Sequence, residues 1–574
     1  MRKSLPGQGA SKGNALGRAR IRQPHALEVA EERIAAKEVD AELERLHAAI
    51  DLVRSEMHAM RERLHGALAR EVGEFLDLHA LLLDDPELLH GLDELISTGR
   101  YGADYALRLQ RDRLASVFEG MDDAYFRSRI EDIDHVIGRV HAALHRREAE
   151  LLGVAGEILV SDAIAPSEVA QLHAQGVLGI VTAGGSALSH SAILARSLHL
   201  PLIVAAAEAL QQVNDGDVLV IDGGSGLLVV EPNADDLREH RDRQRDEKRE
   251  RKQLHRLRRE PSRTLDGIDI RLYANAESRE DVAEAHALGA AGIGLYRTEV
   301  LFLQRPELPT EEEQFRAYRD LVLGMTGRMV TIRTLDIGAD KADRSGLALR
   351  DEPNPALGLR GVRLSLSRRD VFETQLRAIV RASGYGPLRI LVPMVTQRSE
   401  ILDVARALKR VSDRLRREGH AVAKRIPLGA MIEVPAAALA LPTLIDKIDF
   451  LSVGTNDLIQ YLLTADRGND ALGDLYTPMH PAVLQLLHDV IATAAEHDKP
   501  VSVCGEIAAD AMLTPILLAL GLKELSLHPG TLLEVRRAIR AQDLGQLRER
   551  APALLRARDR NAIERWLSRA TEHA

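Results

Sequence analysis

Eight short apolar runs alternate with helical stretches over residues 263–574, and this alternation constrains the fold more than any other feature of the chain. The runs cover residues 270–275, 291–296, 329–334, 389–394, 428–434, 450–454, 501–504 and 524–527. Strands that alternate with helices favour parallel pairing through βαβ units. Eight such units predict a (β/α)8 barrel of the TIM type, whose functional residues lie at the carboxyl ends of the strands.

The first 262 residues divide into three further parts by their pattern. Residues 25–145 carry apolar side chains at spacings of three and four, which predicts a helical bundle or two helical hairpins. Residues 146–231 alternate short apolar runs with glycine and aspartate turns, which predicts a small α/β domain that residues 1–24 rejoin. Residues 232–262 are highly charged, and because acids interleave with bases we expect a solvated linker helix rather than a nucleic-acid-binding arm. The chain is therefore predicted to be a multidomain α/β protein with an inserted α-helical subdomain.

Composition argues against several classes of protein. The 574 residues carry a formal net charge of −10, which argues against nucleic acid as a partner. The single cysteine rules out an intrachain disulfide and indicates a reducing compartment, so we expect a cytoplasmic protein. No run of eighteen apolar residues is present, and the N-terminal residues lack the apolar region of a signal peptide, so we expect no membrane association.

His190 stands out because of its surroundings, which read AGGSALSHSAILARS over residues 183–197. A glycine-containing loop precedes it and an apolar-periodic run follows it, so we expect a helix to begin near Ser189 or His190. The free backbone N–H groups and the positive dipole end at such a position can hold a phosphate. A histidine at a helix start is more often a surface or capping residue, but an imidazole at this one could accept a phosphoryl group.

Polar side chains follow most of the predicted barrel strands directly. They are Arg297, Glu299, Arg333, Asp336, Glu433, Asn456, Asp457, Cys504 and Glu506, with Arg360 and Arg467 on long loops. Strand ends that meet solvent are often polar, which would explain one or two of these residues but not all of them. Guanidinium groups bind phosphate and carboxylate oxygens, and carboxylates bind Mg2+. The set therefore predicts a site for a small, anionic, metal-bound phosphorylated substrate, with the thiol of Cys504 as a candidate proton donor.

The motifs GLYRTE, RTLDIGADK, IEVPAA, SVGTNDLIQY, ADRGND and CGEIA make the chain resemble Enzyme I of the sugar phosphotransferase system, the phosphoenolpyruvate–protein phosphotransferase family. The resemblance covers almost the full length. It implies a phosphohistidine domain over residues 1–24 and 146–231, a helical insertion over residues 25–145 that binds the carrier protein HPr, a charged linker helix over residues 232–262 and a phosphoenolpyruvate-binding barrel over residues 263–574. It also implies a homodimer formed through the barrel.

The resemblance further implies a role for each residue of the site. His190 would accept the phosphoryl group through Nε2 and pass it to HPr, and Cys504 would protonate enolpyruvate to pyruvate. Phosphoenolpyruvate would be bound by Arg297, Arg333, Arg360, Asn456, Asp457 and Arg467. Glu433 and Asp457 would hold Mg2+, and Arg196 would steady the phosphorylated imidazole. The expected activity is the first step of a phosphotransferase system that serves sugar uptake or regulation.

The sequence departs from the family pattern at three places. A hydroxyl that the family carries two residues before the histidine is lost to Leu188, in the stretch Ser186-Ala187-Leu188. That hydroxyl could orient the imidazole, so we expect an altered rate rather than a different acceptor. Ala339 replaces the usual second glycine after the third barrel strand. His528 stands in place of a serine-rich turn after the eighth strand, and we expect it to be a structural turn residue.

Three other assignments fit the sequence less well. Phosphoenolpyruvate synthase and pyruvate phosphate dikinase resemble the same two domains, but they need an additional nucleotide-binding domain, for which residues 25–145 are too few and too uniformly helical. A regulatory protein would use the same chemistry and pass phosphate to a regulatory acceptor instead of a sugar permease. A catalytically inactive scaffold would not need the full set of polar residues at the barrel mouth.

Overall fold

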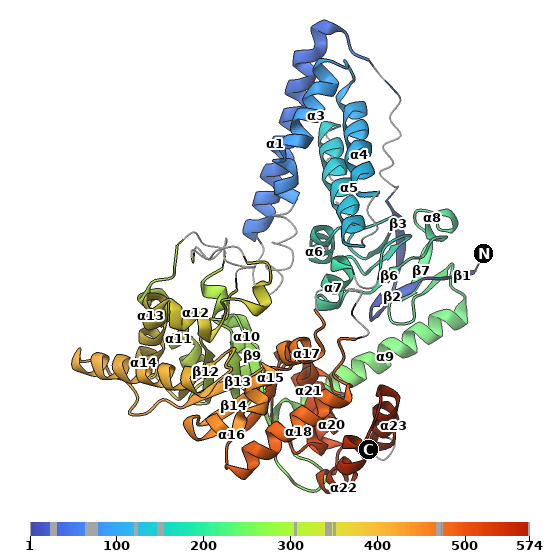
Figure 1. Cartoon of the computed structure of the whole chain (residues 1–574). Coiled ribbons are helices and arrows are strands. Elements are labelled where there is room, and N and C mark those ends of the chain that lie inside the picture. Colours follow the sequence, from blue (N-terminus) through green and yellow to red (C-terminus); the bar gives the residue numbers. More distant parts are fainter. Residues whose placement is uncertain are drawn as a thin grey trace. The chain divides into compact units, whose positions relative to one another are not determined.

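The computed structural model of the chain describes residues 2–22, 31, 33–63, 79–119, 124–145, 154–186, 189–303, 307–338, 347, 352–466, 472 and 475–571. The chain divides into two compact units, Met1–Arg249 and Glu250–Ala574 (Figure 1). None of the helices in these described ranges combines the length and the apolar character needed to cross a bilayer.

The first unit contains an eight-stranded sheet in the order β1-β8-β7-β3-β4-β5-β6-β2. Its strands are β1 (Lys3–Pro6), β2 (Gln8–Ser11), β3 (Asn14–Ile21), β4 (Glu157–Ser161), β5 (Gly179–Thr182), β6 (Leu202–Val204), β7 (Val218–Asp222) and β8 (Leu227–Val230). Strands β3 to β6 pair in parallel, and the other pairs are antiparallel. β1 and β2 lie at opposite ends of this order although only Gly7 separates them in the sequence. Because one residue spans at most about 3.6 Å, the sheet must curl until its two edges lie close together.

Helices connect β3 to β4, which are adjacent parallel strands of that sheet. They are η1 (Ala36–Glu38), α1 (Val39–Arg63), α3 (Pro86–Ser97), α4 (Ala103–Glu119) and α5 (Ala124–Leu144). α3 begins at Pro86, where Asp85 caps the helix by accepting a 2.8 Å hydrogen bond from Glu87 N. The predicted fold class, a small α/β domain with an α-helical insertion, is confirmed.

The remaining helices of the first unit are short, except for the helix over residues 234–256, which continues past Arg249, the last residue of the unit. α6 (Pro166–Gln175), α7 (His190–Ser197) and α8 (Ala209–Gln212) belong to the α/β part. α9 (Ala234–Arg256) and η2 (Leu257–Arg259) occupy the charged segment, as predicted. Arg243 pairs with Glu239 one turn earlier at 2.5 Å, as expected of a solvated helix with ion pairs along it.

The second unit is built on a closed barrel of eight parallel strands. They are β9 (Arg271–Ala276), β10 (Gly292–Tyr296), β11 (Met329–Arg333), β12 (Leu388–Val392), β13 (Leu428–Ile432), β14 (Phe450–Val453), β15 (Val501–Cys504) and β16 (Glu524–Leu527), and β16 pairs with β9 to close the ring. All eight predicted strands are confirmed to within two residues. Most of their residues are apolar and buried, because the strands pack both against the barrel interior and against the helices.

Helices surround the barrel strands. The α-helices are α10 (Arg279–Ala287), α11 (Glu311–Gly324), α12 (Val362–Ser367), α13 (Arg369–Ala382), α14 (Arg398–Arg417), α15 (Pro435–Leu439), α16 (Leu441–Leu444), α17 (Thr455–Leu463), α18 (Pro481–Glu496), α19 (Glu506–Ala509), α20 (Thr514–Ala519), α21 (Leu532–Arg540), α22 (Leu544–Leu555) and α23 (Arg560–Thr571). One-turn 3-10 segments lie at Glu299–Leu301, Pro355–Leu357, Ile445–Lys447 and Pro529–Thr531. Because aromatic residues make up only 3% of the chain, the core between strands and helices is mainly leucine, isoleucine, valine and alanine.

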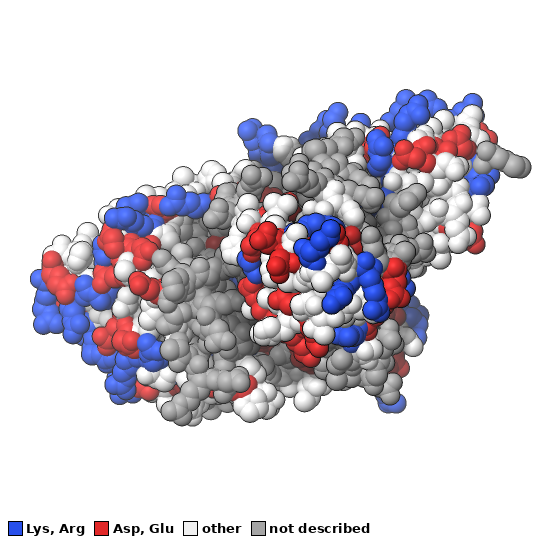
Figure 2. All heavy atoms as spheres, turned by 90° about the horizontal axis from the view of Figure 1, so that it is seen from above, with Lys and Arg blue, Asp and Glu red and all other residues white. Residues whose placement is uncertain are grey.

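The described surface mixes charges of both signs. Figure 2 shows lysine and arginine side chains interspersed with aspartate and glutamate over the face that it presents. Among the described residues of that view, the continuous basic area typical of nucleic-acid-binding proteins is not seen.

Candidate active site at the barrel mouth

Five barrel strands carry the predicted site residues at their carboxyl ends. Arg297 follows β10, Arg333 ends β11, Glu433 follows β13, Asn456 and Asp457 lie in the first turn of α17 after β14, and Cys504 ends β15. Because all eight strands are parallel, these ends meet on one face of the barrel. The expectation that the polar strand ends share one mouth is confirmed.

Three carboxylates meet at this mouth. Asp336, Glu433 and Asp457 each present an oxygen, and these oxygens lie within 4.8 Å of one another. Glu433 is 1% exposed, and its Oε1 accepts a 2.6 Å hydrogen bond from the backbone N–H of Met394. Gly454 is needed beside it, because a Cβ at that position would lie 2.7 Å from Glu433 Oε2. Asp336 was predicted from the sequence to lie at a strand end, without a role as a ligand.

Arg333 reaches this carboxylate cluster from β11. Its Nη1 lies 3.1 Å from Asp336 Oδ2, and its Nη2 lies 3.2 Å from Glu299 Oε1. Its Nε is buried and has no hydrogen-bond partner among the described residues. Burial disfavours the charged guanidinium, but the surrounding carboxylates outweigh burial and raise the pKa of Arg333. The buried Nε–H of the Arg333 guanidinium can therefore donate a hydrogen bond to a further acceptor.

Arg360 enters the site from the loop that precedes α12. Its Nε and Nη2 bind the two oxygens of Asp336 at 3.1 and 3.0 Å. Its Nη1 donates to the hydroxyl of Tyr461 at 3.2 Å, and its Nη2 lies 3.6 Å from Asp457 Oδ2. Tyr461 in turn donates to the carbonyl of Ala356 at 2.6 Å. The predicted substrate-binding arginine is thus held at the mouth by Asp336 after β11 and by two residues of α17.

The charges at the mouth do not balance. Asp336, Glu433 and Asp457 offer three negative charges, whereas the arginines that contact this cluster, Arg333 and Arg360, supply two positive ones. Burial, followed by the charges of Asp336 and Asp457, raises the pKa of Glu433 well above its ordinary range. A hard divalent cation prefers carboxylate oxygens and would relieve this repulsion. The donor set therefore fits Mg2+, with Glu433 and Asp457 as the predicted ligands and Asp336 beside them.

Cys504 lies at the end of β15 among apolar side chains of the barrel interior. Its Sγ accepts a hydrogen bond from the hydroxyl of Ser452 at 3.0 Å. Burial raises the pKa of the Cys504 thiol to about 11. The sulfur therefore keeps its proton at neutral pH, as a proton donor must.

Two further predicted residues are held by glutamates. Arg297 Nη1 donates to Glu277 Oε1 at 2.7 Å, and the side chain remains 41% exposed. The carboxamide of Asn456 donates to Glu506 Oε1 at 3.1 Å and accepts from Glu506 N at 3.0 Å. Both side chains are therefore fixed at the rim of the mouth with open access.

Helix α7 of the first unit begins at His190, as predicted. Ser189 is its N-cap, and its hydroxyl accepts a 3.3 Å hydrogen bond from Ala192 N. Arg196 donates from Nη1 to the carbonyl of Ala10 at 2.8 Å. Residues three or four apart are neighbours on a helix, whereas His190 and Arg196 are six apart. The role of Arg196 toward the imidazole stays a prediction.

Several predicted features lie outside the described residues. They are Arg467, Ala187, Leu188 and Ala339. His528 is described, and its Nδ1 accepts a 3.2 Å hydrogen bond from Gly530 N at the start of the Pro529–Thr531 turn. The prediction that His528 is a structural turn residue is confirmed.

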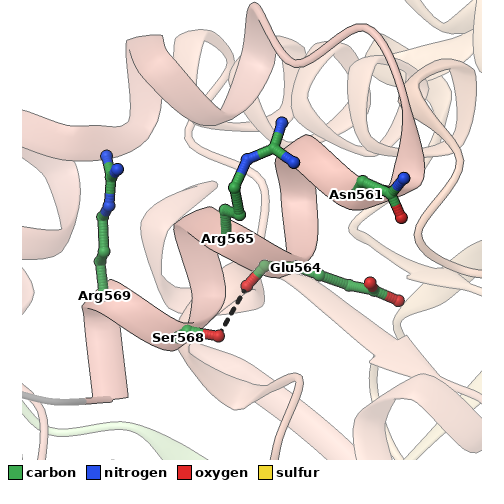
Figure 3. A pocket seen from close by; sticks show the side chains of 5 residues that line it. All are labelled: Asn561, Glu564, Arg565, Ser568 and Arg569. Atoms are coloured by element: carbon green, nitrogen blue, oxygen red, sulfur yellow. Dashed lines mark hydrogen bonds between the residues drawn. The ribbon is translucent and has the colours of Figure 1, made fainter.

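A surface hollow of about 440 Å3 lies elsewhere on the second unit, on α23 (Figure 3). It is lined by Asn561, Glu564, Arg565, Ser568 and Arg569. All five residues belong to this one helix, and Ser568 donates its hydroxyl proton to the carbonyl of Glu564 at 3.0 Å. A hollow on the side of a single helix lacks the converging groups found at the barrel mouth, so we do not assign it to the active site.

Comparison with known proteins identifies the family of the chain. Three family models match in order: PEP-utilising enzyme, N-terminal, over residues 6–129; PEP-utilising enzyme, mobile domain, over residues 153–226; and PEP-utilising enzyme, PEP-binding domain, over residues 251–544. A phosphoenolpyruvate-protein phosphotransferase of Cupriavidus necator is 44% identical, and the match covers 93% of this chain and 94% of the relative. One of Staphylococcus aureus is 37% identical over 96% of each chain. A solution structure of an Enzyme I protein matches 42% of this chain and 99% of its own, at 27% identity and a TM-score of 0.36. The chain belongs to the phosphoenolpyruvate–protein phosphotransferases, the Enzyme I family, and is an enzyme of that class.

Proposed function

We propose that the chain transfers the phosphoryl group of phosphoenolpyruvate to His190 and from there to the phosphocarrier protein HPr, with release of pyruvate. This would be the first step of a phosphotransferase system for sugar uptake or regulation. The observation that carries the proposal is the barrel mouth, where arginines, carboxylates and a protonated thiol converge at the ends of five strands. Such a set suits a substrate that is anionic, needs a metal ion and leaves as an enolate.

The arginines would bind and orient the substrate. We assign phosphoenolpyruvate binding to Arg297, Arg333, Arg360, Asn456, Asp457 and Arg467. The free Nε–H of Arg333 can donate to a phosphate or carboxylate oxygen without breaking an existing bond. Arg297, which is half-exposed, would bind from the rim. Held in this way, the phosphorus can be approached in line by an imidazole nitrogen.

The chemical step breaks the bond between phosphorus and the enol oxygen and forms a bond between phosphorus and Nε2 of His190. The electron pair of the broken bond stays with enolpyruvate. Cys504 then gives its proton to the methylene carbon, which yields pyruvate, and the thiolate recovers a proton from solvent. A thiol whose pKa is about 11 is a strong enough base in its ionised form to be reprotonated readily at neutral pH.

Mg2+ is proposed as the metal ion, with Glu433 and Asp457 as its ligands. When bound, it would supply positive charge to the phosphate and carboxylate oxygens of the substrate. The buried position of Glu433 and its raised pKa support this assignment, because without a cation its ionised form would lie buried beside two further carboxylates.

HPr is the proposed acceptor, docked on the helical insertion, and the proposed assembly is a homodimer formed through the barrel. The Asp84–Asp85 turn of the insertion carries two acids of the kind that could attract a basic HPr surface. Both acids already serve the fold, because Asp84 pairs with Arg54 at 2.7 Å and Asp85 caps α3. We therefore propose that HPr docks on the helices of the insertion and not on this turn.

The decisive test of the reaction is incubation with 32P-labelled phosphoenolpyruvate, Mg2+ and HPr, followed by a check for acid-labile label. We expect label on both proteins. The His190→Ala chain should still bind phosphoenolpyruvate but take up no label. His199→Ala is the matched control, since this second histidine, just beyond α7, is exposed and its Nδ1 lies 3.0 Å from the carbonyl oxygen of Arg196. Label on the His190→Ala chain would overturn the acceptor assignment.

Two further measurements test the finer parts of the proposal. Labelling of a sugar-permease component after addition of HPr would support sugar uptake, whereas label that stops at a regulatory acceptor would support the regulatory branch. Analytical ultracentrifugation of the isolated protein with Mg2+ tests the homodimer, and a monomer at all concentrations would contradict it.

A further inference from the structure

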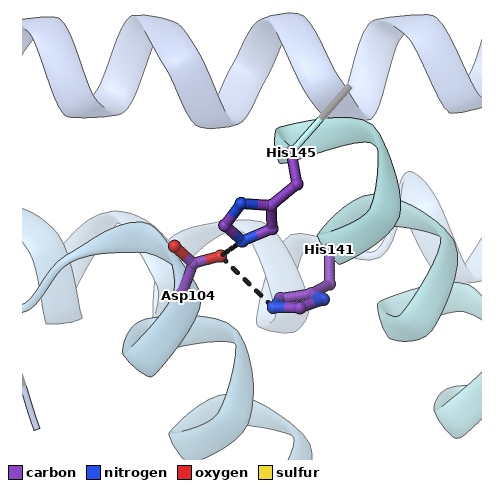
Figure 4. A group of neighbouring side chains, drawn as sticks. All are labelled: Asp104, His141 and His145. Carbon is purple, nitrogen blue, oxygen red and sulfur yellow. Dashed lines mark hydrogen bonds and ion pairs between the residues drawn. The ribbon is translucent and has the colours of Figure 1, made fainter. Parts of the chain in front are cut away.

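Asp104, His141 and His145 form a second cluster of potential metal ligands, which belongs to the helical insertion of the first unit (Figure 4). Nε2 of His145 lies 2.8 Å from Asp104 Oδ1, and Nε2 of His141 lies 3.4 Å from the same oxygen. The three ligand atoms all lie within 4.8 Å of one another. Both imidazoles thus direct the same ring nitrogen at one carboxylate oxygen.

The helix geometry explains why the three side chains meet. His141 lies in the last turn of α5, and His145 directly follows the last helical residue, Leu144, so these side chains four residues apart lie on one face. Asp104 lies in the first turn of α4, which packs against α5. Buried Leu107 of α4 and Val140 of α5 belong to one apolar cluster. The backbone on both sides of the polar cluster is therefore held by packing and not by the polar cluster alone.

Arg45 fixes the carboxylate from the other side. Its Nη2 lies 3.1 Å from Asp104 Oδ2, the oxygen that the imidazoles do not contact. One oxygen is thereby occupied by a guanidinium, and the other is aimed at the two ring nitrogens. Metal-binding carboxylates in proteins are commonly oriented by such an outer hydrogen bond.

We propose that Asp104, His141 and His145 form a binding site for Zn2+ or a closely similar transition-metal ion. Two imidazole nitrogens and one carboxylate oxygen are the donor set such ions prefer. Ligands bound at about 2.0 Å in a tetrahedron lie about 3.3 Å apart. The observed separations of 2.8 and 3.4 Å are near this value, so small side-chain movements suffice. The cluster is partly exposed, which leaves an entry path and a fourth position for water.

The helical insertion also contains an ordinary histidine–aspartate pair, which differs from the cluster in its number of ligands. His47 Nε2 lies 2.9 Å from Asp93 Oδ1, with no second imidazole among the described residues at that carboxylate. The pair joins α1 to α3 in the way the cluster joins α4 to α5. It therefore provides a matched control that offers one histidine and one carboxylate but not three ligands.

The test is a competition titration of the full-length protein with Zn2+ against a chromophoric chelator, in the presence of Mg2+. The carboxylates at the barrel mouth are themselves proposed to bind a divalent ion, so the difference between wild type and variant reports the helical site. We expect His141→Gln and His145→Gln each to lose one Zn2+ equivalent or to weaken it by more than the ~10–100-fold that loss of an orienting partner alone causes. His47→Gln should match wild type.

Folding of the variants is checked by circular dichroism and by thermal melting without metal, and His145 is exposed enough for its replacement to be tolerated. X-ray absorption of the bound zinc gives an independent readout, because imidazole scattering should weaken in both variants. Zn2+ should also raise the melting temperature of the wild type and of His47→Gln but not of the cluster variants. Equal zinc affinity and equal imidazole scattering in wild type and both cluster variants would overturn the proposal. None of these readouts depends on phosphoryl transfer.

Discussion

Arg360 binds both carboxylate oxygens of Asp336, with Nε 3.1 Å from Oδ1 and Nη2 3.0 Å from Oδ2. The same carboxylate accepts Arg333 Nη1 at 3.1 Å and is almost fully buried. One aspartate therefore orients two of the arginines proposed to bind phosphoenolpyruvate. Because a guanidinium is a planar fork that matches a carboxylate, the geometry depends on arginine and not only on positive charge.

Arg360→Lys should therefore weaken substrate binding although it preserves charge. The ammonium group cannot span both oxygens of Asp336 and also reach Tyr461. We expect the KM for phosphoenolpyruvate to rise by about 10- to 100-fold, which is the loss of one or two charge-assisted hydrogen bonds. Arg363→Lys is the control, since its guanidinium bonds to the backbone carbonyls of Leu357 and Gly358. Equal KM values for the two variants would refute the positioning role of the Asp336 contact.

Cys504→Ala should slow pyruvate release while phosphoenolpyruvate still binds. Loss of a general acid typically costs about 10²- to 10⁴-fold in rate. Because the pKa of this thiol is raised to about 11, its acid form persists throughout the neutral range. Alkylation by iodoacetamide, which needs the thiolate, should accordingly be at least ~10-fold slower at pH 8 than for a free cysteine. Cys504 is the only cysteine of the chain, so mass spectrometry reads this rate directly. Unchanged turnover in the variant would remove the thiol from the mechanism.

The sequence predicted the barrel well because its signal is local. A strand such as Phe450–Val453 is buried on both faces, so it appears as a mostly apolar run followed by polar residues. The curling of the first sheet was not predictable in this way. β1 pairs with β8 and β2 with β6, and nothing in the five residues around Gly7 reveals partners some two hundred positions away.

The types and positions of individual site residues could be predicted from the sequence, but the contacts between them could not. Asp336 follows Arg333 by three residues in the motif RTLD, which is a signal that an acid lies close to the mouth. Its pairing with Arg360 depends on the path of a loop and on the contact with Tyr461. The raised pKa of Cys504 likewise arises from burial inside the closed barrel, which no local pattern encodes.

The stability of the second unit without Mg2+ should depend on pH through Glu433. Its pKa is raised in the folded chain by burial and by Asp336 and Asp457, whereas in the unfolded chain the carboxyl ionises near pH 4.3. The folded state therefore binds more protons. The resulting stability is fully present below the unfolded pKa and is lost as pH rises through the folded pKa.

Glu433→Gln should remove this dependence, because the amide stays neutral. Calorimetry without metal between about pH 5 and pH 8 should show the wild-type melting temperature falling relative to that of the variant. Mg2+ should restore the wild type and leave the variant unchanged. Glu400→Gln replaces another buried glutamate, one that accepts backbone hydrogen bonds from Thr396 and Gln397, and should keep the Mg2+ response. Parallel pH profiles for wild type and Glu433→Gln would show that the carboxyl is ionised throughout.

Ser189→Ala should impair phosphoryl uptake more than it impairs stability. Ser189 caps α7 through its hydroxyl, and loss of such a cap costs about 1 kcal/mol. The cost falls on the first turn of α7, whose backbone N–H groups are proposed to hold the phosphoryl group on His190. Since about 1 kcal/mol is a factor of about five in an equilibrium, we expect the rate of labelling from phosphoenolpyruvate to fall roughly 5-fold, with faster amide exchange in α7.

Thr310→Ala removes an equivalent cap from α11 in the barrel unit, where the threonine hydroxyl accepts from Glu313 N at 3.3 Å. It should lower stability by a similar amount and leave the labelling rate near that of wild type. If the two variants lose the same fraction of activity, the effect is one of general stability. If only Ser189→Ala slows labelling, the cap acts on the acceptor, and the hydroxyl of Ser189 then does part of the work that the hydroxyl lost to Leu188 does in the family pattern.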